Sequence, residues 1–258
     1  MKETKIRYKK VKLNDPILIV GLPGIGSVGN LVGENLRITL KAKKFATLHS
    51  PSFPYQIIML NEGKFRLVSN RFYYAKRKKG SNDIVLLLGD AQPLTPEGQY
   101  DVNERIVEFF KMLGGRQVYT IGGYTLGAQY VKKPRVFGLA TDLETREYIK
   151  KQGVTLTNAT GMSVLGSAGM IVAFSRKHKL KAACLMGETG MLDVDANSAK
   201  AVLEVLGKML GIEVDMSNIE KLKEATEKMI KEIEDASRGV LPLPGAGPSH
   251  KESPNYIR

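Results

Sequence analysis

Three glycines, Gly24, Gly26 and Gly29, form a G-x-G-x-x-G motif directly after the apolar run ILIV at 17–20. In a dinucleotide site, such glycines allow a tight turn, close approach of a pyrophosphate and close packing of the next helix on the sheet. The start of that helix, at Ser27, would then face the phosphates. The motif therefore raises two hypotheses: a phosphate- or nucleotide-binding loop, or a structural turn from strand to helix.

The residues around the motif do not complete a nucleotide site. A carboxylate that grips the ribose is expected about 20 residues further on, yet the segment ATLHSPSFPYQ at 46–56 contains neither Asp nor Glu. The lysine of a P-loop is missing as well, because Ser27 and Val28 follow Gly26, and Pro23 removes one backbone N–H donor from the loop. We therefore expect no dinucleotide cofactor. A structural turn is favoured, and binding of a phosphate through the remaining amides is left open.

Other side chains with catalytic potential are few and scattered. The three histidines, His49, His178 and His250, are far apart in the sequence, so we expect no metal site. Cys184 stands in the apolar run AACLM, where a buried and inert thiol is expected. Among the acids, the following end strands or stand in loops: Asp90, Glu97, Glu188, Asp193 and Asp195. Helix capping and loop hydrogen bonds explain such acids best, so the sequence predicts a protein that is not an enzyme. The alternative is a phosphate- or nucleoside-binding enzyme that uses the glycine loop at 21–29.

The apolar pattern alternates between strand-like and helix-like segments, which indicates an α/β fold. Amphipathic periodicity, caps and glycine stops predict helices at 27–40, 100–114, 142–153 and 195–211, and residues 161–179 begin glycine-rich and continue into a helix. Strands are predicted at 15–21, 44–50, 83–90, 116–124, 135–141 and 180–189, and residues 55–80 read as two or three antiparallel strands with a tight turn at 61–63.

The end of the chain differs from the rest. A capping box at Ser217–Glu220 predicts an amphipathic helix over 217–238, which closes a single α/β domain of residues 1–238. From residue 239 the sequence is rich in Pro and Gly, which predicts a flexible tail over 239–258. That tail ends in Tyr256-Ile257-Arg258. An aromatic and apolar end on a tether is either a frayed terminus or a peptide that binds a partner.

Composition limits the location and the partners. The 258 residues carry a formal net charge of +13, which suits an acidic partner. Basic clusters fit solvated faces better than a nucleic-acid site, so nucleic acid is not the expected partner. The apolar runs are too short to span a membrane, and one cysteine fits a reducing compartment. The segment MKETKIRYKKVKL at 1–13 has no apolar stretch, so we do not expect it to be a secretory signal. The cytoplasm is the expected location.

Several segments together resemble the proteasome assembly chaperone family, in particular the archaeal homologues of eukaryotic proteasome assembly chaperone 2. They are ILIVGLPGIGSVGNLVGENL, GDAQPLTPEGQY, TIGGY, GMSVLGSAG and GETGMLDVDANSAKAVLEVLGKMLG. The resemblance covers about residues 10–215, and the order and spacing of these segments are more specific than any one of them.

The resemblance implies a three-layer α/β/α sandwich with a mixed central sheet, similar in outline to nucleoside phosphorylases. It also implies a homo-oligomer, a tetramer or pentamer, that binds core proteasome α-subunits or a related assembly factor. Some archaeal members dock on the α-ring with a C-terminal hydrophobic–tyrosine–any-residue motif. Here Tyr256 is third from the end and Ile257 is penultimate. Either the tail therefore docks in a shifted register, or it binds another partner, or it is not used.

Overall fold

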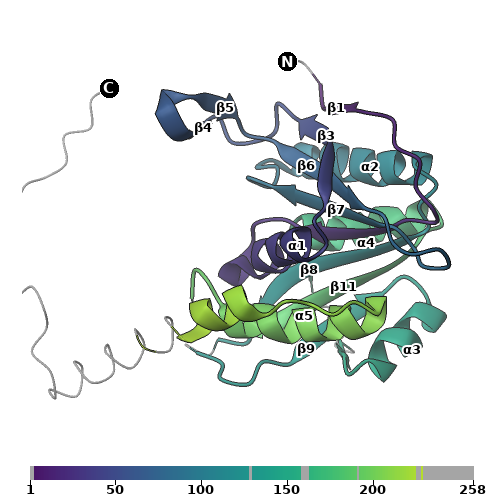
Figure 1. The fold of residues 1–258 in the computed structure, drawn as a ribbon, viewed down its shortest axis with the longest axis vertical. Coiled ribbons are helices and arrows are strands. Elements are labelled where there is room, and N and C mark those ends of the chain that lie inside the picture. Colours follow the sequence, from purple (N-terminus) through teal and green to yellow (C-terminus); the bar gives the residue numbers. More distant parts are fainter. Residues whose placement is uncertain (1–2, 128–129, 158–162, 191, 225–227, 229–258) are drawn as a thin grey trace, which may run out of the picture.

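Strands and helices alternate through most of the chain (Figure 1). The computed structural model describes residues 3–127, 130–157, 163–190, 192–224 and 228. The strands are β1 (Lys5–Tyr8), β2 (Ile17–Gly21), β3 (Lys43–His49), β4 (Ile57–Met59), β5 (Phe65–Leu67), β6 (Asn70–Ala75), β7 (Ile84–Gly89), β8 (Gln117–Thr125), β9 (Val136–Ala140), β10 (Thr155–Leu156) and β11 (Lys181–Thr189). The α-helices are α1 (Val28–Thr39), α2 (Pro96–Met112), α3 (Leu143–Lys151), α4 (Ser167–Lys177) and α5 (Ala196–Leu210). Two short 3-10 helices are η1 (Ile25–Ser27) and η2 (Asn61–Gly63).

Nine strands form one mixed sheet in the order β1-β3-β6-β7-β2-β8-β11-β9-β10. Its centre is parallel, since β2 pairs in parallel with both β7 and β8, and β8 pairs in parallel with β11. Antiparallel pairs join β6, β3 and β1 on one side and β9 on the other. The predicted mixed central sheet is confirmed.

Helices cover both faces of this sheet, which gives the three predicted layers (Figure 1). The run at β2 is buried on both sides, as is usual for a central parallel strand. Leu18 and Val20 belong to the cluster that contains side chains of α2 and α4, whereas Ile17 and Ile19 belong to the cluster with α1, α3 and α5. Each fully buried aliphatic side chain of this kind contributes about 1.5–3 kcal/mol.

The predicted elements agree with the structure at most positions, with three exceptions. Helix α2 begins at Pro96 rather than at residue 100, because the Thr95 side chain accepts a hydrogen bond from the Gly98 amide and Pro96 occupies the first turn. Strands β1 and β10 were not predicted. Both are short edge strands whose side chains are mostly exposed, so they lack the apolar pattern of a buried strand.

The predicted C-terminal helix is described only at its start. Residues 217–224 are helical, and Ile219 is buried against the α1–α5 side of the core. The remainder of the predicted helix, apart from residue 228, lies outside the described residues, as does the predicted tail at 239–258. Within the described part, no helix is long and apolar enough to cross a membrane.

The segment between β3 and β6 leaves the sheet as a projecting hairpin (Figure 1). Strands β4 and β5 pair only with each other, and η2 makes the turn predicted at 61–63. Glu62 and Gly63 both have positive φ there, 60° and 70°. The third strand of this segment, β6, belongs to the main sheet. We call residues 55–68 the arm.

Candidate functional site

The glycine motif forms the tight connection from β2 through η1 to α1. Gly26 and Ser27 are left-handed, with φ of 60° and 50°, which lets the chain reverse direction before the helix. A side chain at Gly29 would place its Cβ 2.6 Å from the Leu22 carbonyl oxygen and 2.9 Å from that of Ile121. Gly29 therefore lets α1 lie directly against the sheet.

The space in front of this loop is filled by the chain itself. The Gly26 carbonyl accepts a 2.8 Å hydrogen bond from the Asp195 amide, and the Ser27 hydroxyl donates to the Asp193 carbonyl over 2.9 Å. A Cβ at Gly26 would lie 2.6 Å from the Thr189 hydroxyl. The carboxylate of Asp195 accepts from that same hydroxyl and from the Ser198 amide. A loop packed beside an acidic side chain favours the structural interpretation over phosphate binding.

Gln92, in the loop after β7, links two glycine-rich segments across the same edge of the sheet. Its amide nitrogen donates to the Pro23 carbonyl over 2.6 Å, and its side-chain oxygen accepts from the Ser167 amide over 2.7 Å. It thereby joins the loop before α1 to the first residue of α4. In α/β enzymes, ligands occupy this carboxyl edge of the parallel strands, whereas here a glutamine side chain bridges it.

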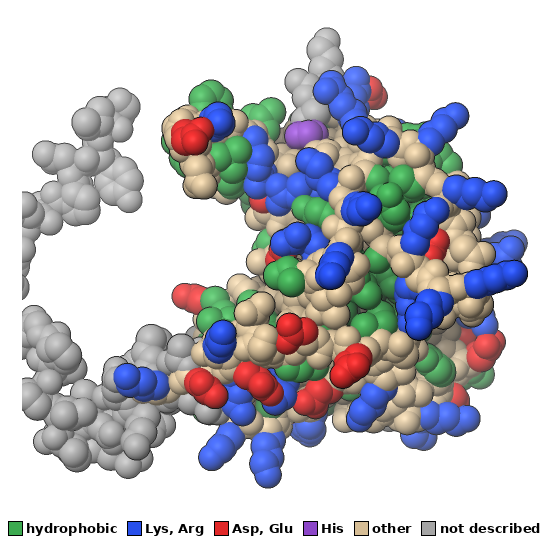
Figure 2. Space-filling view, viewed as in Figure 1, with side chains coloured by type: hydrophobic (Ala, Val, Ile, Leu, Met, Phe, Trp, Pro, Cys, Tyr) green, Lys and Arg blue, Asp and Glu red, His purple; other side chains and the backbone are tan. Residues whose placement is uncertain are grey.

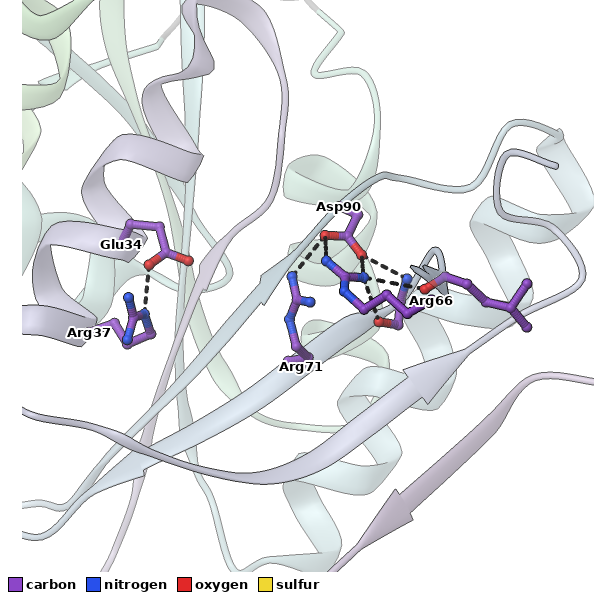
Figure 3. Close-up of polar contacts among 7 residues, drawn as sticks. Glu34, Arg37, Arg66, Arg71 and Asp90 are labelled. Carbon is purple, nitrogen blue, oxygen red and sulfur yellow. Dashed lines mark hydrogen bonds and ion pairs between the residues drawn. The ribbon is translucent and has the colours of Figure 1, made fainter. Parts of the chain in front are cut away.

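Asp90, the acid that follows β7, lies at the centre of an ion-pair cluster (Figure 3). Its carboxylate receives two hydrogen bonds from the Arg66 guanidinium, one from Arg71 over 2.8 Å and one from the Ser69 amide over 3.0 Å. The side chain of Asp90 is 11% exposed. Because Arg66 belongs to β5, this cluster fastens the arm to the body.

The cluster also shifts the ionisation of its members. Burial opposes ionisation of Asp90, but the hydrogen bonds from Arg66, Ser69 and Arg71 outweigh it and lower the pKa of Asp90. The hydrogen bond to Asp90 raises the pKa of Arg66. Burial, together with the charges of Arg7 and Arg66, lowers the pKa of His49. Asp90 is therefore held as a charged structural anchor, which is unlike the poised acid of a catalytic site.

Two other acids singled out in the sequence, Glu188 and Asp195, also have structural partners. Glu188 pairs with the Arg135 guanidinium at 2.8 Å, and these hydrogen bonds lower the pKa of Glu188. Asp195 caps α5 through the Ser198 amide, and Glu97 lies in the first turn of α2, where a negative charge is favourable. The predicted capping and hydrogen-bonding roles are thus observed for Asp90, Glu188 and Asp195.

Two further groups were candidates for chemistry. Glu104, Glu108 and His178 bring their ligand atoms within 4.8 Å of one another, but Glu104 already accepts from the Lys177 ammonium at 2.6 Å. Cys184 is buried as predicted, and burial raises the pKa of its thiol to about 11. The Glu104 carboxylate is thus already engaged by an ammonium group, and the Cys184 thiol is inaccessible.

Exposed apolar side chains gather at the carboxyl edge of the parallel strands, where sequence reasoning placed no partner site. Five loops contribute one side chain each, at least 38% exposed: Ile25, Leu94, Leu126, Leu165 and Val194. The arm leaves from this same edge, since Asn70 at its end pairs with Gly89 at the end of β7. The predicted partner residues Tyr256, Ile257 and Arg258 lie outside the described residues.

These features define an α/β protein whose strand-end acids stabilise the fold and whose loops and arm present apolar surface at one edge. The PAC2 family profile matches residues 18–235, so the chain belongs to the PAC2 family. The resemblance stated from the sequence is confirmed.

Solved structures and curated relatives agree with this assignment. The crystal structure of Pyrococcus furiosus PbaB, described as an archaeal proteasome activator, is 35% identical, with a TM-score of 0.85 over 91% of this chain and 100% of that one. Pyrococcus furiosus PbaA, described as an archaeal homolog of proteasome-assembly chaperone, is 26% identical, with a TM-score of 0.73 over 92% and 96% of the two chains. The uncharacterized protein MJ1210 of Methanocaldococcus jannaschii is 34% identical over 98% of both chains.

Proposed function

We propose that this protein is a non-enzymatic proteasome assembly chaperone or proteasome activator. The observation that carries the proposal is the family match over residues 18–235, together with the 35% identity to an archaeal proteasome activator along 91% of the chain.

The local geometry supports a binding role. Asp90 and Glu188 are engaged by arginines, and Gln92 bridges the edge where an α/β enzyme would hold its substrate. The same edge exposes aliphatic side chains, which suit a protein partner better than a small polar substrate. The proposed mechanism is therefore presentation of a surface, without a chemical step.

We propose that a homo-oligomer of this chain binds the α-ring of the core proteasome, or its separate α-subunits, in the cytoplasm. The net charge of +13 would steer the protein toward an acidic surface. Each copy would contribute Tyr256, Ile257 and Arg258, and several weak contacts on one ring would add through avidity. Binding would then depend on both the oligomer and the end of the chain.

A binding experiment with purified archaeal core proteasome tests the proposal. The full chain is expected to bind, and the variant that lacks residues 239–258 is expected to bind at least tenfold more weakly, because avidity multiplies small losses. Tyr256→Ala is expected to weaken binding, whereas His250→Ala, in the same segment, serves as the matched control. If the full chain binds neither the proteasome nor its free α-subunits, the proposed function is wrong.

Two further assays separate the two forms of the function. An activator is expected to raise the rate at which the mature core proteasome hydrolyses small peptides. An assembly chaperone is expected to change the rate at which separate α- and β-subunits form the core particle, without effect on the mature particle. Activity in either assay, abolished with the deletion of 239–258, would support docking through the C-terminal residues.

A further inference from the structure

The arm carries an apolar face that is largely exposed in the described part of the chain. In its two-stranded ladder, Ile57 lies opposite Leu67 and Met59 lies opposite Phe65. Directly paired residues project to the same side of a sheet, so these four side chains form one face, which we call the outward face. They are 50–67% exposed. Figure 2 shows hydrophobic side chains on the projecting arm, whereas Lys and Arg are spread over much of the body.

The opposite face of the arm is already used. Ile58 packs against the core cluster on the α2–α4 side, and Arg66, which lies opposite Ile58, binds Asp90. The arm is therefore held to the body by one face and presents the other to its surroundings. A two-stranded hairpin alone is at best marginally stable in water, so a partner that covers the outward face would stabilise the arm.

A hollow lies at the base of the outward face. It measures about 730 Å³ and is lined by Phe53, Pro54, Tyr55, Ile57 and Leu67, among others. Tyr55 is fully exposed at its rim. The tip of the arm thus offers projecting side chains, Met59 and Phe65, while its base offers a concave apolar surface. A protrusion and a hollow on one surface are what a self-complementary contact requires.

The distribution of charge favours a second copy of this chain as the partner that covers the outward face. The protein carries +13 overall, so most pairs of its surfaces would repel one another. On the arm, however, Glu62 pairs with Lys64 at 2.8 Å and Arg66 is matched by Asp90. The outward face is uncharged, whereas an acidic partner would be drawn to the basic parts of the body. Two copies can therefore meet at the arm without bringing like charges together.

The area is sufficient for such a contact. At these exposures the four side chains and Tyr55 present on the order of 500 Å². Two such faces would bury about 1,000 Å², which is the lower range of specific protein interfaces. We propose that the outward face of the arm is an interface between copies of this chain, in which two arms pack tip to base about a two-fold axis. Because a two-fold contact joins copies in pairs, a tetramer follows more readily than a pentamer.

The inference rests on the oligomeric part of the proposed function, and the mass of the free protein tests both. Sedimentation at about 10 µM is expected to show an even-numbered oligomer for the wild type. Phe65→Asp is expected to halve that mass or reduce it further, since an unpaired charge at each tip, buried against the apolar base of the other arm, weakens the contact about 100-fold or more. Leu143→Asp, on α3 and 74% exposed, is the matched control and is expected to keep the wild-type mass.

A mixing experiment shows whether a loss of mass comes from the contact between arms or from misfolding of the arm itself. Equal amounts of Phe65→Asp and Tyr55→Lys are expected to regain oligomers that neither forms alone, because the new negative charge at the tip of one arm then meets the new positive charge at the base of the other. A monomeric wild type would overturn both the oligomer and the arm interface. An oligomeric wild type with unchanged mass in Phe65→Asp would overturn the arm interface alone. If Phe65→Asp keeps its mass and loses proteasome binding, the arm interface is also overturned, since the arm would then contact the proteasome.

Discussion

Replacing Asp90 with asparagine is expected to destabilise the protein by about 2–4 kcal/mol. Removing one partner of a buried ion pair costs about 3–5 kcal/mol, because the remaining charge stays buried. Asp90 is 11% exposed, but Arg66 and Arg71 are 29% and 20% exposed, so water compensates part of the loss. For a chain of this size the melting temperature is then expected to fall by roughly 5–15 °C.

Thermal unfolding followed by circular dichroism measures this change, and Glu34→Gln is the matched control. Glu34 pairs with Arg37 one turn away on α1 at 2.6 Å, as Figure 3 shows, and its side chain is 40% exposed. Such a surface pair contributes about 0–1 kcal/mol. Equal melting temperatures for wild type and Asp90→Asn, or equal losses for the two variants, would refute the structural role of Asp90.

The pH dependence of the free energy of unfolding provides a second test of the same ion-pair cluster. The folded-state pKa of Asp90 is lowered by its hydrogen bonds. Its contribution to stability is therefore fully present above the unfolded value near 3.9 and is lost as the pH falls through the folded pKa. The stability difference between wild type and Asp90→Asn is expected to shrink at pH below about 4. A difference that persists undiminished at still lower pH would contradict this account.

Three further predictions concern the glycine loop and the buried thiol. Gly29→Ala is expected to cost about 1–3 kcal/mol in urea unfolding, because its Cβ meets two backbone carbonyls. Gly24→Ala, whose Cβ would be 3.6 Å from the nearest atom, the Gln92 side-chain nitrogen, is expected to be nearly neutral; equal costs would argue that the motif is not a packing device. Gln92→Ala is expected to cost about 1–3 kcal/mol, because it leaves the amide of the buried Ser167 and the half-buried Pro23 carbonyl without this partner, and wild-type stability would show that its bridge is unimportant. Cys184, with its pKa raised to about 11, is expected to react with a thiol reagent at pH 8 only after unfolding, and rapid labelling of the native protein would contradict its burial.

The sequence predicted the sheet well where a single pattern of apolar residues extends through a whole strand. The runs at β2 and β7 are continuous and apolar, as strands buried on both faces must be, and Asp142 and Asp195 begin their helices as N-caps. The start of α2 was misplaced because the loop-like series Pro-Leu-Thr-Pro contains the cap itself: Thr95 followed by a proline in the first turn.

The site was predicted less completely, because its contacts join residues that are distant in the chain. The position of Asp90 after a strand indicated a functional or structural acid, yet nothing in the sequence paired it with Arg66 and Arg71, which precede it by 24 and 19 residues. The bridge from Gln92 to Ser167 spans 75 residues. The sequence predicts the strands of the arm but does not show that they leave the main sheet. Alternation of apolar and polar residues alone does not reveal whether an apolar face is covered.

The position of β2 at the centre of the sheet has a consequence for synthesis of the chain. Ile17 pairs with both Ile84 and Gln117, so the first long apolar strand gains its second neighbour only when a segment one hundred residues further on has left the ribosome. At about 5–20 residues per second, that strand waits roughly 5–20 s with an unpaired edge. A protein proposed to assist the assembly of others thus exposes an unpaired, aggregation-prone apolar strand during its own synthesis.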